Sequence, residues 1–171
     1  MTDQEFSTER CIVRRWREAD LPALLAVYGD ADAMQWVGAG QPITLDQCVQ
    51  WLAVTQHNYT RYGYGMFAVE LKGSLEVVGF CGLVRPGGQA QPELKYAYHR
   101  VHWGQGLATE VAAGLLQHAA RRLGLQHVMA TAAPENHRSH QVLLKAGMVR
   151  GALVNNLDET STLVFEWRAV G

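Results

Sequence analysis

The sequence predicts a mixed α+β domain built around one largely antiparallel sheet. Two patterns indicate this fold class. Apolar residues recur at spacings of three and four in several segments, as in amphipathic helices, and they alternate with polar residues in others, as in strands. The predicted order is a strand, two helices, a strand meander, a long helix, a strand, a short helix and a closing hairpin.

The chain is expected to open with a strand and a helix. Residues 11–16 alternate like a short strand, with Ile12 and Arg14 on one face. A helix is expected over 18–30, with Asp20 as its N-cap. Its apolar stripe would consist of Leu21, Leu24, Leu25 and Tyr28.

A second helix is predicted over 44–59. Thr44 and Gln47 stand at the spacing of a capping box, which marks the start of this helix. The side chains expected to be buried along it are Leu45, Cys48, Val49 and Leu52. The glycine-rich segment 30–43, between the two helices, is interpreted as a loop over a pocket.

From residue 65 onward the apolar residues mostly follow the alternating pattern of strands. Residues 65–84 predict a hairpin around a turn at 72–74. The remaining predicted elements are strands over 93–99 and 125–132, helices over 105–122 and 134–147, and a final hairpin that pairs 151–154 with 161–169. Gly124 is the expected stop of the first of these helices, and the second is expected to end at Gly147.

Composition limits the class of protein. The 171 residues are 48% hydrophobic and 18% charged with a net charge of −1, which suits one globular domain over 1–171. No basic excess is available to neutralise nucleic-acid phosphates, so no nucleic-acid partner is expected. The polar N-terminus does not resemble a signal peptide, and no stretch of 18 apolar residues predicts a membrane span. The three cysteines are odd in number and far apart, which favours buried free thiols, and we expect a cytoplasmic protein.

The stretch from His99 to Leu115, HRVHWGQGLATEVAAGL, has the features of an anion site. A strand leads into a glycine-containing turn, which becomes the first turn of a helix. Unpaired N–H groups and the positive end of the helix dipole favour a phosphate there, and Gly104 and Gly106 let it approach the backbone. The sequence matches neither the dinucleotide fingerprint nor the P-loop. The glycine spacing alone therefore leaves an ordinary turn as an alternative.

Three blocks of the sequence are informative together: RRWREADLPAL, HRVHWGQGLATEVAAGLLQHA and PENHRSHQVLLKAGM. In this order they resemble the GNAT superfamily of acyl-CoA N-acyltransferases, and within it the branch of the RimJ and RimL ribosomal-protein N-acetyltransferases. The third resembles that branch's Asn-x-x-Ser-x-x-x-Leu-x-Lys-x-Gly segment, with Asn136, Ser139, Leu143, Lys145 and Gly147 at the matching positions. The chain departs from the family pattern at Val101, where the acyl-CoA motif often has Gln or Arg.

The resemblance implies a GNAT-type fold, a mixed and mostly antiparallel sheet with a splayed central strand pair flanked by helices. It also implies acetyl-CoA as co-substrate. The backbone that would hold the coenzyme A pyrophosphate belongs to Val101, Gly104, Gln105, Gly106, Leu107, Ala108 and Thr109. The strand around Tyr96 to His99, including Tyr98, would pair with the pantetheine arm through main-chain hydrogen bonds, as a peptide adds to a sheet edge. Asn136 would bind the arm, although a pure N-cap role is an equal alternative.

The same resemblance suggests roles in catalysis. Ser139 would protonate or hydrogen-bond the departing sulfur, with an ordinary solvated helix position as the alternative. Glu93 would accept the amine's proton, unless it is only a carboxylate tied to a neighbouring strand. Backbone N–H groups near Tyr98 or His99 would stabilise the oxyanion. The His99 side chain and Glu70 are further candidates for the base, and Trp103 is interpreted as a packing anchor.

We therefore expect an acetyl-CoA-dependent N-acetyltransferase that moves an acetyl group directly to a primary amine of a protein N-terminus or a small molecule. Deprotonation at pH 7 costs about 1 kcal/mol for an N-terminus and about 5 kcal/mol for lysine, which favours the former at a site without a strong base. The alternatives are a catalytically silent acyl-CoA-binding regulatory module and a small-molecule or antibiotic amine acetyltransferase. No metal is expected, since the histidine pairs lack companion ligands. A homodimer would use 85–92 or the C-terminal strand.

Overall fold

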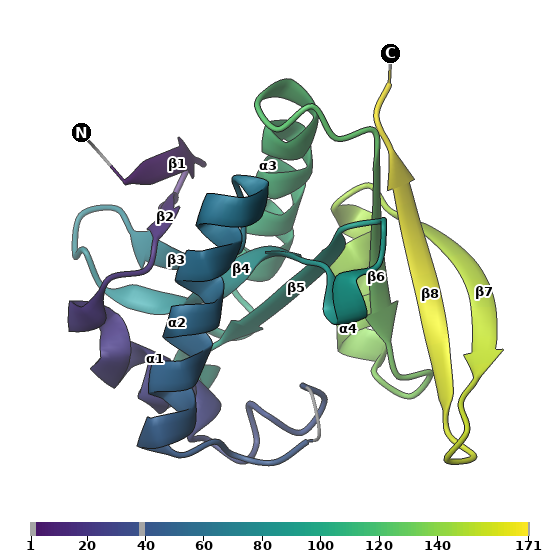
Figure 1. The fold of residues 1–171 in the computed structure, drawn as a ribbon, viewed down its shortest axis with the longest axis horizontal. Helices are drawn as coiled ribbons and strands as arrows, with labels where there is room; N and C mark the ends of the chain where they lie inside the picture. The colour runs from purple at the N-terminus through teal and green to yellow at the C-terminus, as the bar shows by residue number, and fades with distance from the viewer. Residues whose placement is uncertain (1–2, 38–39, 171) are drawn as a thin grey trace.

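The computed structural model describes residues 3–37 and 40–170 and contains one sheet with helices on both faces (Figure 1). The strands are β1 (Gln4–Ser7), β2 (Cys11–Arg15), β3 (Met66–Leu71), β4 (Val77–Val84), β5 (Glu93–Tyr98), β6 (His127–Ala132), β7 (Val149–Asn155) and β8 (Ser161–Arg168). The α-helices are α1 (Leu21–Tyr28), α2 (Leu45–Tyr62), α3 (Leu107–Arg121) and α4 (His137–Lys145). Single 3-10 turns occur at η1 (Glu18–Asp20), η2 (Pro86–Gly88) and η3 (Arg100–His102).

The sheet confirms the predicted mixed, mostly antiparallel architecture. Its strand order is β1-β2-β3-β4-β5-β6-β8-β7, and only β5 and β6 are parallel neighbours. These two strands pair at a single position, Glu93 with Met129, and then diverge (Figure 1). The splayed central pair is thus present, and it opens toward the ends of β5 and β6.

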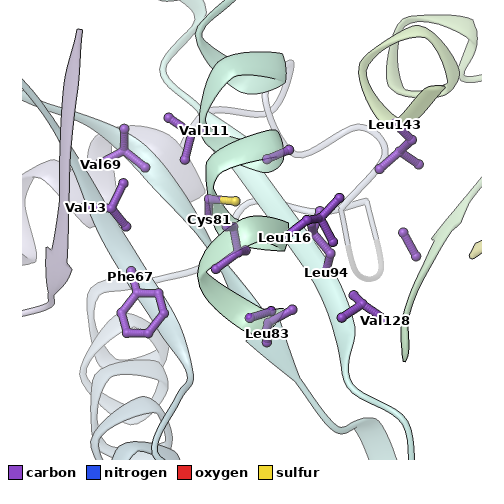
Figure 2. Close-up of a cluster of buried hydrophobic side chains, with 14 of the residues drawn as sticks. Val13, Phe67, Val69, Cys81, Leu83, Leu94, Val111, Leu116, Val128 and Leu143 are labelled. Atoms are coloured by element: carbon purple, nitrogen blue, oxygen red, sulfur yellow. The ribbon is translucent and has the colours of Figure 1, made fainter. Parts of the chain in front are cut away.

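The core is divided by the sheet into two clusters. One contains the inner sides of α3 and α4, with Leu94 of β5 and Val111 of α3 among its members (Figure 2). The other joins α1 and the N-terminal part of α2 to the opposite sheet face. Cys11, Cys48 and Cys81 are buried and free, as the sequence predicted. No helix in the described ranges combines the length and the apolar character needed to cross a membrane.

Helix α2 begins as predicted but buries a different stripe. Thr44 and Gln47 form the expected capping box, with Oγ1 of Thr44 accepting from the Gln47 N–H at 3.2 Å. The expectation that Leu45 and Val49 are buried is wrong, because these side chains are 52% and 49% exposed. The buried side chains are instead Cys48, Leu52, Thr55 and Tyr59, which recur at the helical spacing of three and four. Polar Thr55 belongs to this stripe, and an apolar pattern does not reveal it.

Asp20 occupies the predicted N-cap position of α1, but its side chain makes no capping hydrogen bond to that helix. Its two carboxylate oxygens accept hydrogen bonds from the Arg14 guanidinium at 2.8 and 2.9 Å, and one of them also accepts from the Arg17 N–H. A bidentate partner of opposite charge competes more strongly for a carboxylate than a helix N–H does. Strand β1 was also missed, because it is only four residues long and none of its side chains is fully buried.

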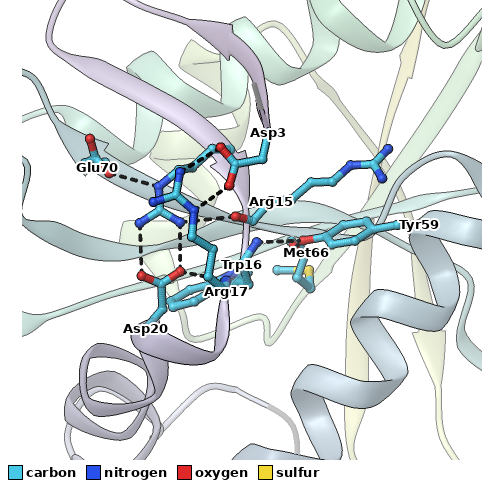
Figure 3. A network of polar contacts seen from close by, with 9 residues as sticks. Asp3, Arg15, Trp16, Arg17, Asp20, Tyr59, Met66 and Glu70 are labelled. Carbon is cyan, nitrogen blue, oxygen red and sulfur yellow. Dashed lines mark hydrogen bonds and ion pairs between the residues drawn. The ribbon is translucent and has the colours of Figure 1, made fainter. Parts of the chain in front are cut away.

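Arg14 is the centre of a buried ion network that holds α1 against the sheet. Its Nε donates to Glu70 on β3 at 2.9 Å, and Asp20 binds the other end of the guanidinium (Figure 3). The exposed fraction of the Arg14 side chain is only 6%. The negative charges of the two carboxylates, Asp20 and Glu70, are therefore balanced by this one guanidinium.

Replacing Arg14 with alanine is expected to lower the free energy of unfolding by about 3–5 kcal/mol, because two poorly solvated carboxylates lose their partner. Arg17→Ala is the matched control, since Arg17 pairs with Asp3 but is 55% exposed, and it should cost less than about 1 kcal/mol. Denaturant unfolding of both variants measures the difference. Equal losses would contradict the special role of Arg14.

Candidate active site

The turn between β5 and α3 has an open backbone with two left-handed residues. Gly104 and Gly106 have φ values of 77° and 79°, a region that side chains rarely adopt. A Cβ added at Gly104 would meet no protein atom within 4 Å, and one at Gly106 would meet only Nη2 of Arg10 at 3.4 Å. The glycines are therefore required by the backbone conformation, and the space beside them is open to a ligand.

The first turn of α3 presents its N–H groups at this opening. The Glu110 N–H makes the first intrahelical bond, to the Gly106 carbonyl at 3.1 Å. The N–H groups of Leu107, Ala108 and Thr109 precede it and have no partner within the helix. The side chain of Leu107 is buried in the core, whereas that of Val101 is 66% exposed. The departure from the family pattern at Val101 thus leaves the main-chain donors in place.

The turn is held by hydrogen bonds from the loop between β1 and β2. Glu110 accepts hydrogen bonds from Oγ1 of Thr8 at 2.6 Å and from the N–H and Nε of Arg10 at 2.9 and 2.8 Å. Nη1 of Arg10 also donates to the carbonyl of Gln105 at 2.8 Å. Sequence reasoning missed Arg10, because a hundred residues separate it from Glu110 and no local pattern joins them.

This contact makes a pH-dependent contribution to stability. Burial alone would raise the pKa of Glu110, but the hydrogen bonds from Thr8 and Arg10 outweigh it and lower that pKa below its ordinary value. A lowered carboxyl pKa stabilises the fold above the unfolded value of about 4.3, and the contribution is lost as the pH falls further. The melting temperatures of wild type and Glu110→Gln are therefore expected to differ from pH 7 down to about pH 4.3 and to converge only as the pH falls below that value. A constant difference would contradict this assignment.

Trp103 connects the turn to its surroundings. Its indole Nε1 donates to the carbonyl of Tyr98 at 2.9 Å, and the Arg138 guanidinium on α4 lies 4.7 Å from its ring centroid. The side chain therefore anchors the turn to the end of β5, as its interpretation as a packing residue predicted. The Arg138 contact brings the first turn of α4 close to the same opening.

The free edge of β5 carries a main-chain pattern suited to an extended ligand. The His99 N–H donates to the Val78 carbonyl at 2.8 Å, so this group faces β4 and is not available to a pantetheine arm or an oxyanion. Antiparallel pairing alternates, so the N–H groups of Tyr96 and Tyr98 point to the other side, where β6 diverges. Tyr98 thus remains a candidate main-chain donor, whereas the expectation for the His99 N–H is corrected.

Helix α4 brings Asn136 and Ser139 to the opposite side of the gap. Oδ1 of Asn136 accepts from the Ser139 N–H at 3.2 Å, so Asn136 is the N-cap of α4 and its amide nitrogen is left to donate elsewhere. Oγ of Ser139 lies 2.6 Å from the hydroxyl of Tyr96 on β5. Ser139 is therefore not an ordinary solvated helix residue. The side chain of Tyr96 also belongs to the candidate site, whereas the sequence analysis expected only main-chain pairing from this residue.

Glu93 lies where β5 and β6 touch. Its side chain is buried, and Oε1 accepts a hydrogen bond from Oγ1 of Thr131 on β6 at 2.7 Å. Side chains alternate along a strand, so Glu93 points to the sheet face opposite that of Leu94 and Tyr96, which pack with the α3 and α4 core. Glu93 and Ser139 thus approach the gap from opposite faces of the sheet.

The other candidate bases differ in their surroundings. Glu70 is paired with Arg14 in the buried ion network on β3 and is not part of this site. Nδ1 of His99 is buried and has no hydrogen-bond partner within the described chain. In residues 3–37 and 40–170, no cluster of three His, Cys, Asp or Glu side chains is suited to a metal ion. The glycine-rich segment 30–43, interpreted as a loop over a pocket, contains positions 38 and 39, which lie outside the described residues.

Comparison with known proteins agrees with this geometry. The model of a family described as "Acetyltransferase (GNAT) domain" matches residues 10–149. An uncharacterized protein, YkkB of Bacillus subtilis, is 28% identical over 144 residues, covering 82% of this chain and 83% of its own. The uncharacterized N-acetyltransferase YoaA of the same organism is 24% identical over 145 residues, covering 83% of this chain and 81% of its own.

Solved structures share the fold. A GNAT-family acetyltransferase from Bacillus anthracis superposes with a TM-score of 0.82 at 22% identity, covering 95% of this chain and 96% of that one. RimL, a ribosomal L7/L12 alpha-N-protein acetyltransferase solved with coenzyme A, superposes with a TM-score of 0.81 at 16% identity, covering 96% and 97%. At these identities the likeness is one of architecture.

Proposed function

The chain belongs to the GNAT acetyltransferase family, and from that premise we propose that it transfers the acetyl group of acetyl-CoA directly to a primary α-amine. The observation that carries the proposal is the open glycine turn at the start of α3, which adjoins the gap between β5 and β6. We take residues 1–171 as one catalytic domain.

The cofactor would be bound mainly by main-chain groups. The N–H groups around Gly106 and in the first turn of α3 would hold the pyrophosphate, with the helix dipole adding to the attraction. The segment concerned is Val101, Gly104, Gln105, Gly106, Leu107, Ala108 and Thr109. The pantetheine arm would lie in the gap, pair with the free edge of β5 at Tyr96 and Tyr98, and accept a hydrogen bond from the amide of Asn136.

Transfer would proceed without a covalent enzyme intermediate. The neutral amine attacks the thioester carbonyl, and a main-chain donor such as the Tyr98 N–H stabilises the oxyanion. The carbon–sulfur bond then breaks, the sulfur leaves with its electron pair, and Ser139 donates a hydrogen bond to it. Glu93 accepts the proton that the amine loses, directly or through water, and the thiolate later takes a proton from solvent. The buried free cysteines take no part.

The preferred acceptor is a protein N-terminus. Deprotonation at neutral pH costs about 1 kcal/mol for an α-amine and about 5 kcal/mol for a lysine amine. A site whose base is a single carboxylate, such as Glu93, therefore favours the α-amine. RimL, an alpha-N-protein acetyltransferase, has the same architecture. A small amine is the competing acceptor. The microcin C7 self-immunity acetyltransferase MccE, solved with acetyl-CoA and AMP, also shares the fold, so the architecture alone does not choose between acceptors.

The proposal is tested by binding and turnover on the same protein. Calorimetry should detect acetyl-CoA and coenzyme A binding after carried-over ligand is removed, and thiol release should then report transfer. Acceptors would be short peptides with a free N-terminus, the same peptides with a blocked N-terminus and an internal lysine, and small amines. Turnover only on free N-termini supports the proposal, and turnover only on small amines favours the small-molecule alternative. Binding without turnover on any of them would favour the silent module.

A further inference from the structure

Tyr96 and Ser139 form a hydroxyl pair across the gap in which the cofactor would lie. Tyr96 comes from β5 and Ser139 from the first turn of α4, and their oxygens are 2.6 Å apart. We propose that Tyr96 is a positioning residue, which donates a hydrogen bond to Ser139 and thereby directs the Ser139 proton to the sulfur of the bound cofactor. This inference rests on the proposed function, and it assigns a role to a side chain outside the glycine turn.

The direction of the hydrogen bond follows from the chemistry of the two groups. A phenol is the more acidic hydroxyl, so it is the better donor, and an aliphatic hydroxyl has two acceptor sites but only one proton. If Tyr96 occupies one acceptor site of Ser139, the single Ser139 proton must point elsewhere. The Ser139 N–H is held by Asn136, so the turn that carries this hydroxyl is itself fixed.

Tyr96 keeps its proton during the reaction. Burial raises the pKa of Tyr96 to about 12, although the hydrogen bond to Ser139 opposes the shift. An ordinary thiol has a pKa of about 8.5, so the transfer of a proton from Tyr96 to a thiolate is unfavourable by roughly 3.5 pKa units, a factor of about 3,000. Tyr96 therefore acts through Ser139 and is not the source of the proton.

The proposal is tested on coenzyme A, before any acceptor is known. The thiol of bound coenzyme A can be titrated by the ultraviolet absorbance of its thiolate. A hydrogen bond donated to the sulfur stabilises the thiolate, so its loss raises the pKa of the bound thiol. Ser139→Ala is expected to raise this pKa by roughly one unit, and Tyr96→Phe by roughly half a unit. Tyr64→Phe, which removes another buried phenol hydroxyl, is the matched control and should leave it unchanged.

The double variant separates positioning from direct contact. If Tyr96 acts only through Ser139, adding Tyr96→Phe to Ser139→Ala produces no further shift. In a Ser139→Thr background, which keeps a hydroxyl, the effect of Tyr96→Phe should return. A full extra shift in the double variant would mean that Tyr96 binds the sulfur itself and would overturn the proposal.

The remaining outcomes are also distinguishable. Coenzyme A binding with no change in the thiol pKa for Tyr96→Phe would overturn this inference and leave the proposed function standing. Absence of coenzyme A binding by the wild-type protein would overturn both. Circular dichroism and thermal melting of each variant test whether the fold is retained. Tyr96→Phe should keep the fold, because phenylalanine retains the aromatic ring that packs in the core.

Discussion

Replacing Gly106 with valine is expected to weaken coenzyme A binding by at least about tenfold while the protein stays folded. The loss of one hydrogen bond to a charged group is worth about 1.5–3 kcal/mol, and a side chain in the open space beside the turn blocks several N–H groups at once. Gly104→Val should act in the same way, since its added side chain also projects into open space. Calorimetric dissociation constants measure the effect.

Backbone strain has to be separated from this loss. A residue with a side chain in the left-handed region costs about 1–2 kcal/mol wherever it occurs. Gly124 follows the other end of α3, has a φ of 67°, and has no protein atom within 4 Å of an added Cβ. Gly124→Val therefore imposes the same strain away from the turn and should bind coenzyme A normally. Equal weakening in all three variants would show that the glycines of the turn have no special role.

Replacing Glu93 with glutamine is expected to lower kcat by about 10²–10⁴-fold, the usual contribution of a general base. Coenzyme A binding should change little, because the carboxylate lies on the sheet face opposite the α3 and α4 core. Steady-state kinetics on the acceptor found in the peptide screen measure these effects.

Thr131→Val decides between a catalytic and a structural role for Glu93. This variant removes the hydrogen bond to Glu93 but keeps the carboxylate. If Glu93 only ties β5 to β6, both variants should lose similar stability and similar activity. If Glu93 is the base, Thr131→Val should retain most of the rate that Glu93→Gln loses.

The sequence predicted the architecture because periodicity is a local property. The apolar spacing located the helices, alternation located most strands, and Gly104 and Gly106 marked the turn that the structure shows to be left-handed. Burial within α2 was predicted less well, since Leu45 and Val49 are exposed. An apolar side chain at the edge of a helical stripe can be either buried or exposed, and the packing of the neighbouring elements decides between the two.

The side-chain pairs of the candidate site could not be predicted in this way. Tyr96 with Ser139 and Glu93 with Thr131 are 43 and 38 residues apart, and each depends on how strands and helices meet in space. Asp20 illustrates the same limit, because its place before a helix suggested a cap while Arg14 on another element bound its carboxylate. The resemblance to a family supplied Glu93 and Ser139, but it gave no partner for either.

The divergence of β5 and β6 has a mechanical consequence. Beyond Glu93 and Met129 the two strands are not hydrogen-bonded to each other, so the sheet consists of two halves that are joined at a single paired position. A pantetheine arm in the gap would supply the main-chain partners that a strand would otherwise provide. In that arrangement acetyl-CoA would be both a reactant and a temporary part of the sheet. Each turnover would break the main-chain hydrogen bonds between the pantetheine arm and β5 and form them again with the next cofactor molecule.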